Sequence, residues 1–355
     1  MFRFNPQTQK KLRRFRQIKR GYYSFLLLAG LLVVLAFGEL LVNSRALIVS
    51  YEGELYFPTY TAFHPGTDFG LDYAYETNYR ELRDVFDAEN DGNWLIMPLV
   101  PYNPFENHAP GGVFRPLAPD AAQQHYLGTD TTSRDILARL FYGTRIALLF
   151  AIGFMLAVYL IGITIGCAMG YYGGMFDLVF QRLIEIWSNI PFLYMVIIVF
   201  SVIPAAFSVS TRILILLLVM VLFSWTGMTY YMRTETYKEK ARDYIAAARV
   251  IGASNSRIIF RHVLPNVLST LVTFMPFTVV AAIASITALD FLGFGLPPPT
   301  PSLGELLKQG TANLRTAPWI VMSAFFTLVA LLTLVTFIGE AVRESFDPKT
   351  YSVYR

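Results

Sequence analysis

Six long apolar segments limit the fold of this chain more than any other feature. They lie at about 22–42, 146–169, 178–204, 213–232, 267–289 and 319–338. A helix needs about 20 residues, at a rise of about 1.5 Å each, to cross about 30 Å of hydrocarbon. Hydrophobic residues make up 54% of the chain and charged residues only 15%, which excludes an ordinary soluble domain. We expect an all-α membrane protein with six transmembrane helices.

The distribution of charge predicts the orientation of these helices. Residues 1–21 hold eight Lys and Arg and no Asp or Glu, so this basic N-terminus should stay in the cytoplasm. The segment 22–42 has no small-residue cleavage site, and we expect it to remain as the first transmembrane helix. Acidic residues then predominate in 43–134, which should lie outside. The basic connector 233–266 and the tail 341–355 should lie in the cytoplasm.

The extracytoplasmic segment 43–134 is predicted to be an irregular insertion after the first helix. Turn-forming residues dominate it, and only 78–88 has the pattern of a short helix. His64, His108 and His125 lie there among many carboxylates, but without the spacing of a metal site. We expect ordinary surface histidines and no metal. The remaining spans form a five-helix core at 135–340, with an outer proline-rich loop at 291–318.

Two apolar spans contain features that could line a translocation path. Proline interrupts the third and the fifth span, and a carboxylate lies about two turns into the third. The candidates are Glu185, Asn189, Pro191 and Pro276. Structural kinks and packing explain these residues equally well. In the second span, Gly162, Gly166 and Gly170 share a four-residue spacing that would let another helix approach closely.

The connector contains a segment, 243–266, that is typical of a docking surface. Its pattern predicts a helix that ends at Gly252, a turn, and a second helix from Ser254 or Asn255 that stops before Pro265. Small side chains permit close approach of another protein, and the arginines can pair with its acidic groups. We assign the following residues to this surface: Asp243, Ala246, Ala247, Ala248, Arg249, Gly252, Ala253, Arg257, Arg261, Leu264 and Pro265.

This segment resembles the cytoplasmic EAA loop of permeases in binding-protein-dependent ABC importers. The family pattern is Glu-Ala-Ala, followed by Gly and then by Leu-Pro, and this chain matches the small residues, the glycine and the Leu-Pro pair. Ala246 stands where the pattern has Glu, which removes one charge from the docking helix.

Further segments extend the resemblance along the chain. The stretches 125–148, 170–177 and 289–307 are similar to corresponding segments of the dipeptide, oligopeptide and nickel subgroup. The basic start, the long acidic loop and residues 182–198 resemble Yej-type permeases of peptide and microcin C uptake.

The resemblance implies a type I ABC importer-like permease in the bacterial inner membrane. Its expected partners are a second homologous permease, two ABC ATPase subunits or one fused ATPase, an extracytoplasmic peptide-binding protein and the lipid bilayer, with no nucleic acid. The chain has no Gly-Lys pair and therefore no P-loop. We expect this chain to be no enzyme and to bind no cofactor, with ATP and Mg held by the partner ATPase. Closure of the ATPases on ATP would drive alternating access for oligopeptides, including peptide antibiotics such as microcin C.

Two other classes of protein remain open at the level of sequence. One is an ATP-independent secondary transporter or channel, although we find neither an internal repeat nor a set of ion-coupling carboxylates. The other is a membrane-anchored sensor or scaffold that binds with the outer segment and signals through the inner one. Substrate-stimulated ATP hydrolysis by the assembled complex would distinguish an importer from both.

Overall fold

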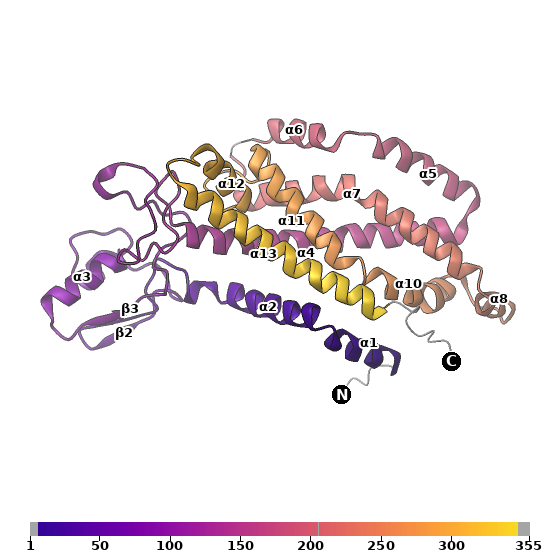
Figure 1. Ribbon diagram of the computed structural model, residues 1–355, viewed down its shortest axis with the longest axis horizontal. Helices are drawn as coiled ribbons and strands as arrows, with labels where there is room; N and C mark the ends of the chain where they lie inside the picture. The colour runs from indigo at the N-terminus through magenta and orange to yellow at the C-terminus, as the bar shows by residue number, and fades with distance from the viewer. Residues whose placement is uncertain (1–5, 205, 347–355) are drawn as a thin grey trace.

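The structure, a computed structural model, describes residues 6–204 and 206–346. The first five residues of the predicted N-terminus and residues 347–355 of the predicted tail lie outside the described residues. The described part is an elongated bundle of helices with a small sheet-containing unit at one end (Figure 1).

The six predicted spans are confirmed by the long helices. Five helices are each long and apolar enough to cross a membrane: α2 (Lys19–Ala36), α4 (Ile136–Tyr172), α7 (Val209–Lys240), α11 (Met275–Leu292) and α13 (Pro318–Phe346). Helices α5 (Gly174–Ser188) and α6 (Phe192–Val202) bend by 73° at the break before Phe192 and supply the sixth span if they are counted as one. Pro191 lies in that break, as its missing N–H and fixed φ favour.

The insertion after α2 is more regular than predicted. It contains a three-stranded antiparallel sheet in the order β2-β1-β3, formed by β1 (Ile48–Tyr51), β2 (Glu54–Tyr56) and β3 (Trp94–Ile96). The expected short helix is present as α3 (Tyr79–Glu89), and the Asn78 side chain caps it. Val49, Leu82 and Phe86 are buried in its own small core. The description of this insertion as irregular was therefore wrong, because strands of three or four residues are too short to show a period of two.

Close packing of α4 against α7 forms the centre of the bundle. A Cβ atom added to Gly166 would lie 2.5 Å from the carbonyl oxygen of Thr229, and one added to Gly170 would lie 2.7 Å from that of Arg233. The glycines that share a four-residue spacing in the sequence therefore form the surface of α4 on which α7 lies. Helices α11 and α13 pack beside this pair, and α2 packs on α13 (Figure 1).

The two ends of the bundle carry different structures. Helices α1 (Pro6–Gln17), α8 (Asp243–Val250) and α10 (Leu264–Leu271) lie at the same end as the last turns of α13 (Figure 1). The sheet, α3 and α12 (Leu303–Ala312) lie at the opposite end. The predicted proline-rich outer loop thus contains a helix. This arrangement agrees with the orientation that the charges predict, with the basic segments at the cytoplasmic end.

Candidate functional site

A knob projects from the cytoplasmic end between α7 and α11. It consists of α8, a turn, α9 (Asn255–Arg257), a π-helical segment (Ile258–Val263) and α10. Gly252 adopts φ +85°, a left-handed conformation that glycine takes without strain, and so ends the first helix. The Ser254 hydroxyl accepts a hydrogen bond from the N–H of Arg257 and starts the second. The predicted helix–turn–helix is confirmed in both of these details.

The predicted stop before Pro265 is wrong. The helical path continues from Asn255 through Pro265 to Leu271. A proline inside an α-helix collides with the carbonyl four residues back and donates no hydrogen bond. Here the preceding π-helical turn changes the hydrogen-bond pattern, since the Leu264 N–H donates to the Ile259 carbonyl five residues back. The wider turn accommodates the ring without ending the helix.

The knob has an attached side and a free side. Ile245, Ile258 and Val263 are fully buried against the bundle, whereas Ala246, Ala247, Gly252 and all three assigned arginines are exposed. Ala248 and Ala253 are partly buried and pack on the core. The predicted docking residues are therefore divided between the two sides, with most of them on the free side.

Two large apolar residues at the tip of the knob were missed by sequence reasoning. Val250 is 88% exposed and Ile251 is 85% exposed, although both belong to the hydrophobic residue types that fold inward. Val250 is the last residue of α8 and Ile251 follows it at the turn, where no core lies for them to enter. Exposed apolar side chains within a ring of small and basic residues are typical of a protein interface. The signal in the sequence was an apolar pair beside the turn glycine.

A polar contact between α8 and α10 holds the base of the knob together. The Asn266 amide donates to the Tyr244 hydroxyl at 2.8 Å, which joins α8 to α10. Burial, and then the hydrogen bond to Glu239, raise the pKa of Tyr244 above its usual value. The phenol therefore stays protonated at neutral pH and donates to the Glu239 carboxylate.

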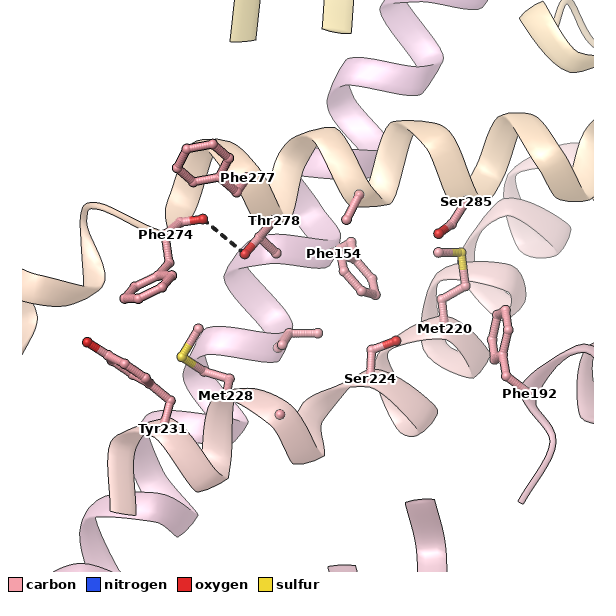
Figure 2. Close-up of a pocket in the computed structure, with 13 residues that line it drawn as sticks. Phe154, Phe192, Met220, Ser224, Met228, Tyr231, Phe274, Phe277, Thr278 and Ser285 are labelled. Atoms are coloured by element: carbon pink, nitrogen blue, oxygen red, sulfur yellow. Dashed lines mark hydrogen bonds between the residues drawn. The ribbon is translucent and has the colours of Figure 1, made fainter. Parts of the chain in front are cut away.

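A cavity of about 550 Å³ lies between α4, α6, α7 and α11. Figure 2 shows Tyr231 and Phe274 facing each other at one end and Phe192 with Met220 at the other. The Tyr231 and Phe274 rings are 4.6 Å apart and nearly T-shaped. Side chains of Ser224, Thr278 and Ser285 add hydroxyl groups to this surface. None of the described residues that line the cavity is charged, so the surface is apolar with scattered hydrogen-bonding groups.

None of the four residues predicted for a translocation path belongs to the lining of this cavity. Pro191 and Pro276 immediately precede Phe192 and Phe277, which do line it. Glu185 pairs with Arg182 at 2.5 Å, and its side chain is 38% exposed. The Asn189 amide donates to the Glu185 carbonyl at 2.7 Å and so caps the end of α5.

A buried charge network at the outer end was also missed. Arg134 Nε donates to Asp130 Oδ2 at 3.0 Å, and Arg134 lies 3.4 Å from Glu305. Arg139, which has no exposed side-chain area, donates to Glu305 and lies 3.3 Å from Asp130. The network joins the start of α4 to α12. The sequence shows the Asp and Arg residues near 130, but their partner is far away along the chain.

Next to this network, a histidine is buried against the cap of α4. His125 Nδ1 lies 2.8 Å from Asp135 Oδ2, and the other carboxylate oxygen of Asp135 accepts from the N–H of Ala138. Tyr102 stacks on the His125 ring at 4.0 Å, and His108 lies beside both. Burial, and then His125, lower the pKa of His108 below its usual value of 6.5. All three expected surface histidines are therefore at least partly buried, and His125 helps to anchor the insertion.

Up to six membrane-spanning helices, an uncharged cavity between four of the helices and a knob at the cytoplasmic end fit the transmembrane subunit of a transporter. The sequence model of the family "binding-protein-dependent transport system inner membrane component" matches residues 162–351. The chain belongs to this family. It is the inner-membrane permease subunit of an ABC importer, and ATP is hydrolysed by the partner ATPase subunits.

Individual relatives place the chain within the family. It is 40% identical to the inner membrane ABC transporter permease protein YejE of Escherichia coli, over 98% of this chain and 99% of that protein. It is 37% identical to the peptidoglycan transport system permease protein YejE of Agrobacterium fabrum, over 98% and 94%. The oligopeptide transport system permease protein OppC of E. coli is 35% identical over 65% of this chain and 75% of its own length.

Among solved structures, a chain of the MetNI methionine ABC transporter in an inward-facing conformation is similar over 59% of this chain and 97% of its own. The TM-score is 0.43 and the sequence identity is 16%.

Proposed function

We propose that this permease imports peptides across the inner membrane by alternating access, as one half of a permease pair. The observation that carries the proposal is the cavity of about 550 Å³, whose lining is apolar and aromatic with hydroxyl groups and without charge. Such a lining contacts varied side chains and supplies a few hydrogen bonds, without selecting one charge. The second permease would close the open side of the cavity. Names of relatives that transport oligopeptides and peptidoglycan support this class of cargo.

The knob is the proposed contact with the ATPase. Val250 and Ile251 would enter an apolar groove of that subunit, while exposed arginines such as Arg249 and Arg257 would pair with acidic groups around it. The exposed face of α8 includes two small side chains, Ala246 and Ala247, and the two backbones can approach closely there. Closure of the ATPases on ATP would then displace the knob and switch the path between inward-open and outward-open states.

The outer end is the proposed contact with a peptide-binding protein. The insertion at 43–134 and the segment 291–318, which holds α12, are presented together at that end (Figure 1). The five-helix core at 135–340 would contain the translocation path. The segment 233–266 within it would couple this path to the ATPases. Oligopeptides, including peptide antibiotics such as microcin C, are the proposed cargo.

The experiment is ATP-dependent uptake of labelled tri- to pentapeptides into liposomes that contain the permease pair, the ATPases and the binding protein. We expect Ala247→Glu to abolish uptake, because it places a charge and bulk on the exposed docking face. The matched comparison is Ala246→Glu, which makes the same change one residue away on the same face, but at the position where the family pattern itself has Glu, so docking should accept it. We expect this variant to retain uptake.

Uptake at the wild-type rate by Ala247→Glu would refute the docking role. Peptide entry without ATP would refute the importer. Comparing plain peptides with the same peptides attached to peptidoglycan sugars would define the cargo, and a complex that moves neither kind would exclude peptides as the substrate class.

A further inference from the structure

Tyr171, near the end of α4, is a buried residue at which three segments of the cytoplasmic side meet. It is 3% exposed, and its hydroxyl donates to Asn255 Oδ1 of α9 at 2.7 Å. The guanidinium carbon of Arg249 in α8 lies 5.5 Å from the centre of the Tyr171 ring. Lys240, at the end of α7, donates from Nζ to the Tyr171 carbonyl oxygen. Tyr171 therefore contacts α8 and α9 of the knob and also α7, the helix that leads into it.

These contacts join the knob to a helix that reaches the other end of the molecule. Helix α4 is continuous from Ile136 to Tyr172 and is locked to α7 by its glycine face. At its outer end Arg139 enters the buried charge network with Glu305 of α12. Residues of the same helix, Phe154 and Val158, line the central cavity. A displacement that reaches Tyr171 therefore reaches the cavity and the outer end through one rigid element.

The contacts of Tyr171 favour joint movement of the knob and α4 over movement of the knob alone. The hydrogen bond to Asn255 is directional, and its donor belongs to a buried residue, so it fixes the position of α9 relative to α4. Contacts of the Arg249 and Lys240 cations with the ring hold α8 and the end of α7 against the same residue. If the knob moved without α4, the buried hydroxyl would lose its partner, which is unfavourable. If the knob and α4 move together, all of these contacts are kept.

We propose that Tyr171 is the positioning residue that transmits displacement of the knob to α4 and so keeps ATP hydrolysis and opening of the path in step. The proposal rests on the proposed function, because it requires that the knob be moved by an ATPase. It adds the specific joint inside this chain through which that movement passes.

The test is the number of peptides imported per ATP hydrolysed by the reconstituted complex. Tyr171→Phe removes the hydroxyl and keeps the ring; we expect this ratio to fall about five-fold, the equilibrium effect of one hydrogen bond, while ATP hydrolysis continues. Asn255→Ala should lower the ratio equally, and the double variant should fall no further, because both changes remove the same bond. Asn255→Asp keeps an acceptor oxygen and should retain the ratio.

The matched control is Tyr172→Phe, the same chemical change at the adjacent residue, which is 57% exposed. It should leave the ratio unchanged. The proposal is overturned if Tyr171→Phe keeps the wild-type ratio, if Tyr172→Phe causes the same loss, or if Tyr171→Phe acts only by releasing the ATPase from the purified complex. A wild-type complex without ATP-dependent uptake would overturn the proposed function itself, and the inference with it.

Discussion

Glu305 is the acidic residue through which α12 contacts two buried arginines of the outer end. Its side chain is 14% exposed and contacts both Arg134 and Arg139. Without Glu305 the two arginines would share one carboxylate, that of Asp130. Loss of one partner of a buried ion pair typically costs about 3–5 kcal/mol. We therefore expect Glu305→Gln to lower the thermal midpoint of the purified permease strongly and to loosen α12.

The control for this prediction is Glu340→Gln. Glu340 pairs with Arg20 at 3.3 Å, but the two side chains are 43% and 57% exposed, so loss of this pair should cost less than about 1 kcal/mol. Equal shifts of the midpoint in the two variants would contradict the assignment of the outer network as buried and stabilising.

For single residues, the sequence predicted the chemical character of the functional side chains better than it predicted which side chains contact each other. The small residues of the knob and its turn glycine were predictable, because a left-handed φ at a helix end strongly favours glycine. The pairing of Arg139 with Glu305 was not, because side chains so far apart in sequence meet only after the helices pack. The exposure of Val250 and Ile251 was hidden as well, since apolar residues next to a helix normally turn inward.

At the element scale, the face between α4 and α7 depends on glycines that lack a side chain. An alanine at Gly166 would bring its Cβ to 2.5 Å from a backbone carbonyl of α7, whereas one at Gly153 would meet only a Leu217 methyl group at 3.6 Å. Gly→Ala in a helix normally stabilises by about 1 kcal/mol, but overpacking typically costs about 1–3 kcal/mol. We expect Gly166→Ala to be destabilising and Gly153→Ala to be neutral or stabilising, measured by thermal midpoint and by yield of folded permease in membranes.

Equal behaviour of the two alanine variants would show that α4 and α7 are not in such close contact.

Length and hydropathy made the spans themselves predictable, since crossing a bilayer demands both. The sheet of the insertion and helix α12 were not predicted, because strands of three or four residues and a ten-residue helix leave weak periodic signals. The continuation through Pro265 was missed because a π-helical turn has no recognisable sequence pattern.

At the scale of the whole molecule, one continuous helix connects three regions with different tasks. Helix α4 begins at the buried charge network, lines the central cavity and ends at the joint with the knob. Its close packing on α7 makes the pair a stiff unit, to which α8 is attached at the cytoplasmic end. Movements at one end of such a unit are carried to the other without large changes inside it.

Coupling to ATP hydrolysis requires above all that the knob face the cytoplasm and be covered there by an ATPase. The direct measurement uses Val250→Cys with Cys167, the single native cysteine, replaced by serine, and a membrane-impermeant maleimide. Because Val250 is 88% exposed, we expect rapid labelling in inside-out vesicles, no labelling in right-side-out vesicles, and protection when the ATPase subunits are bound. Labelling from the outside, or equal labelling with and without the ATPases, would contradict the proposed coupling through the knob.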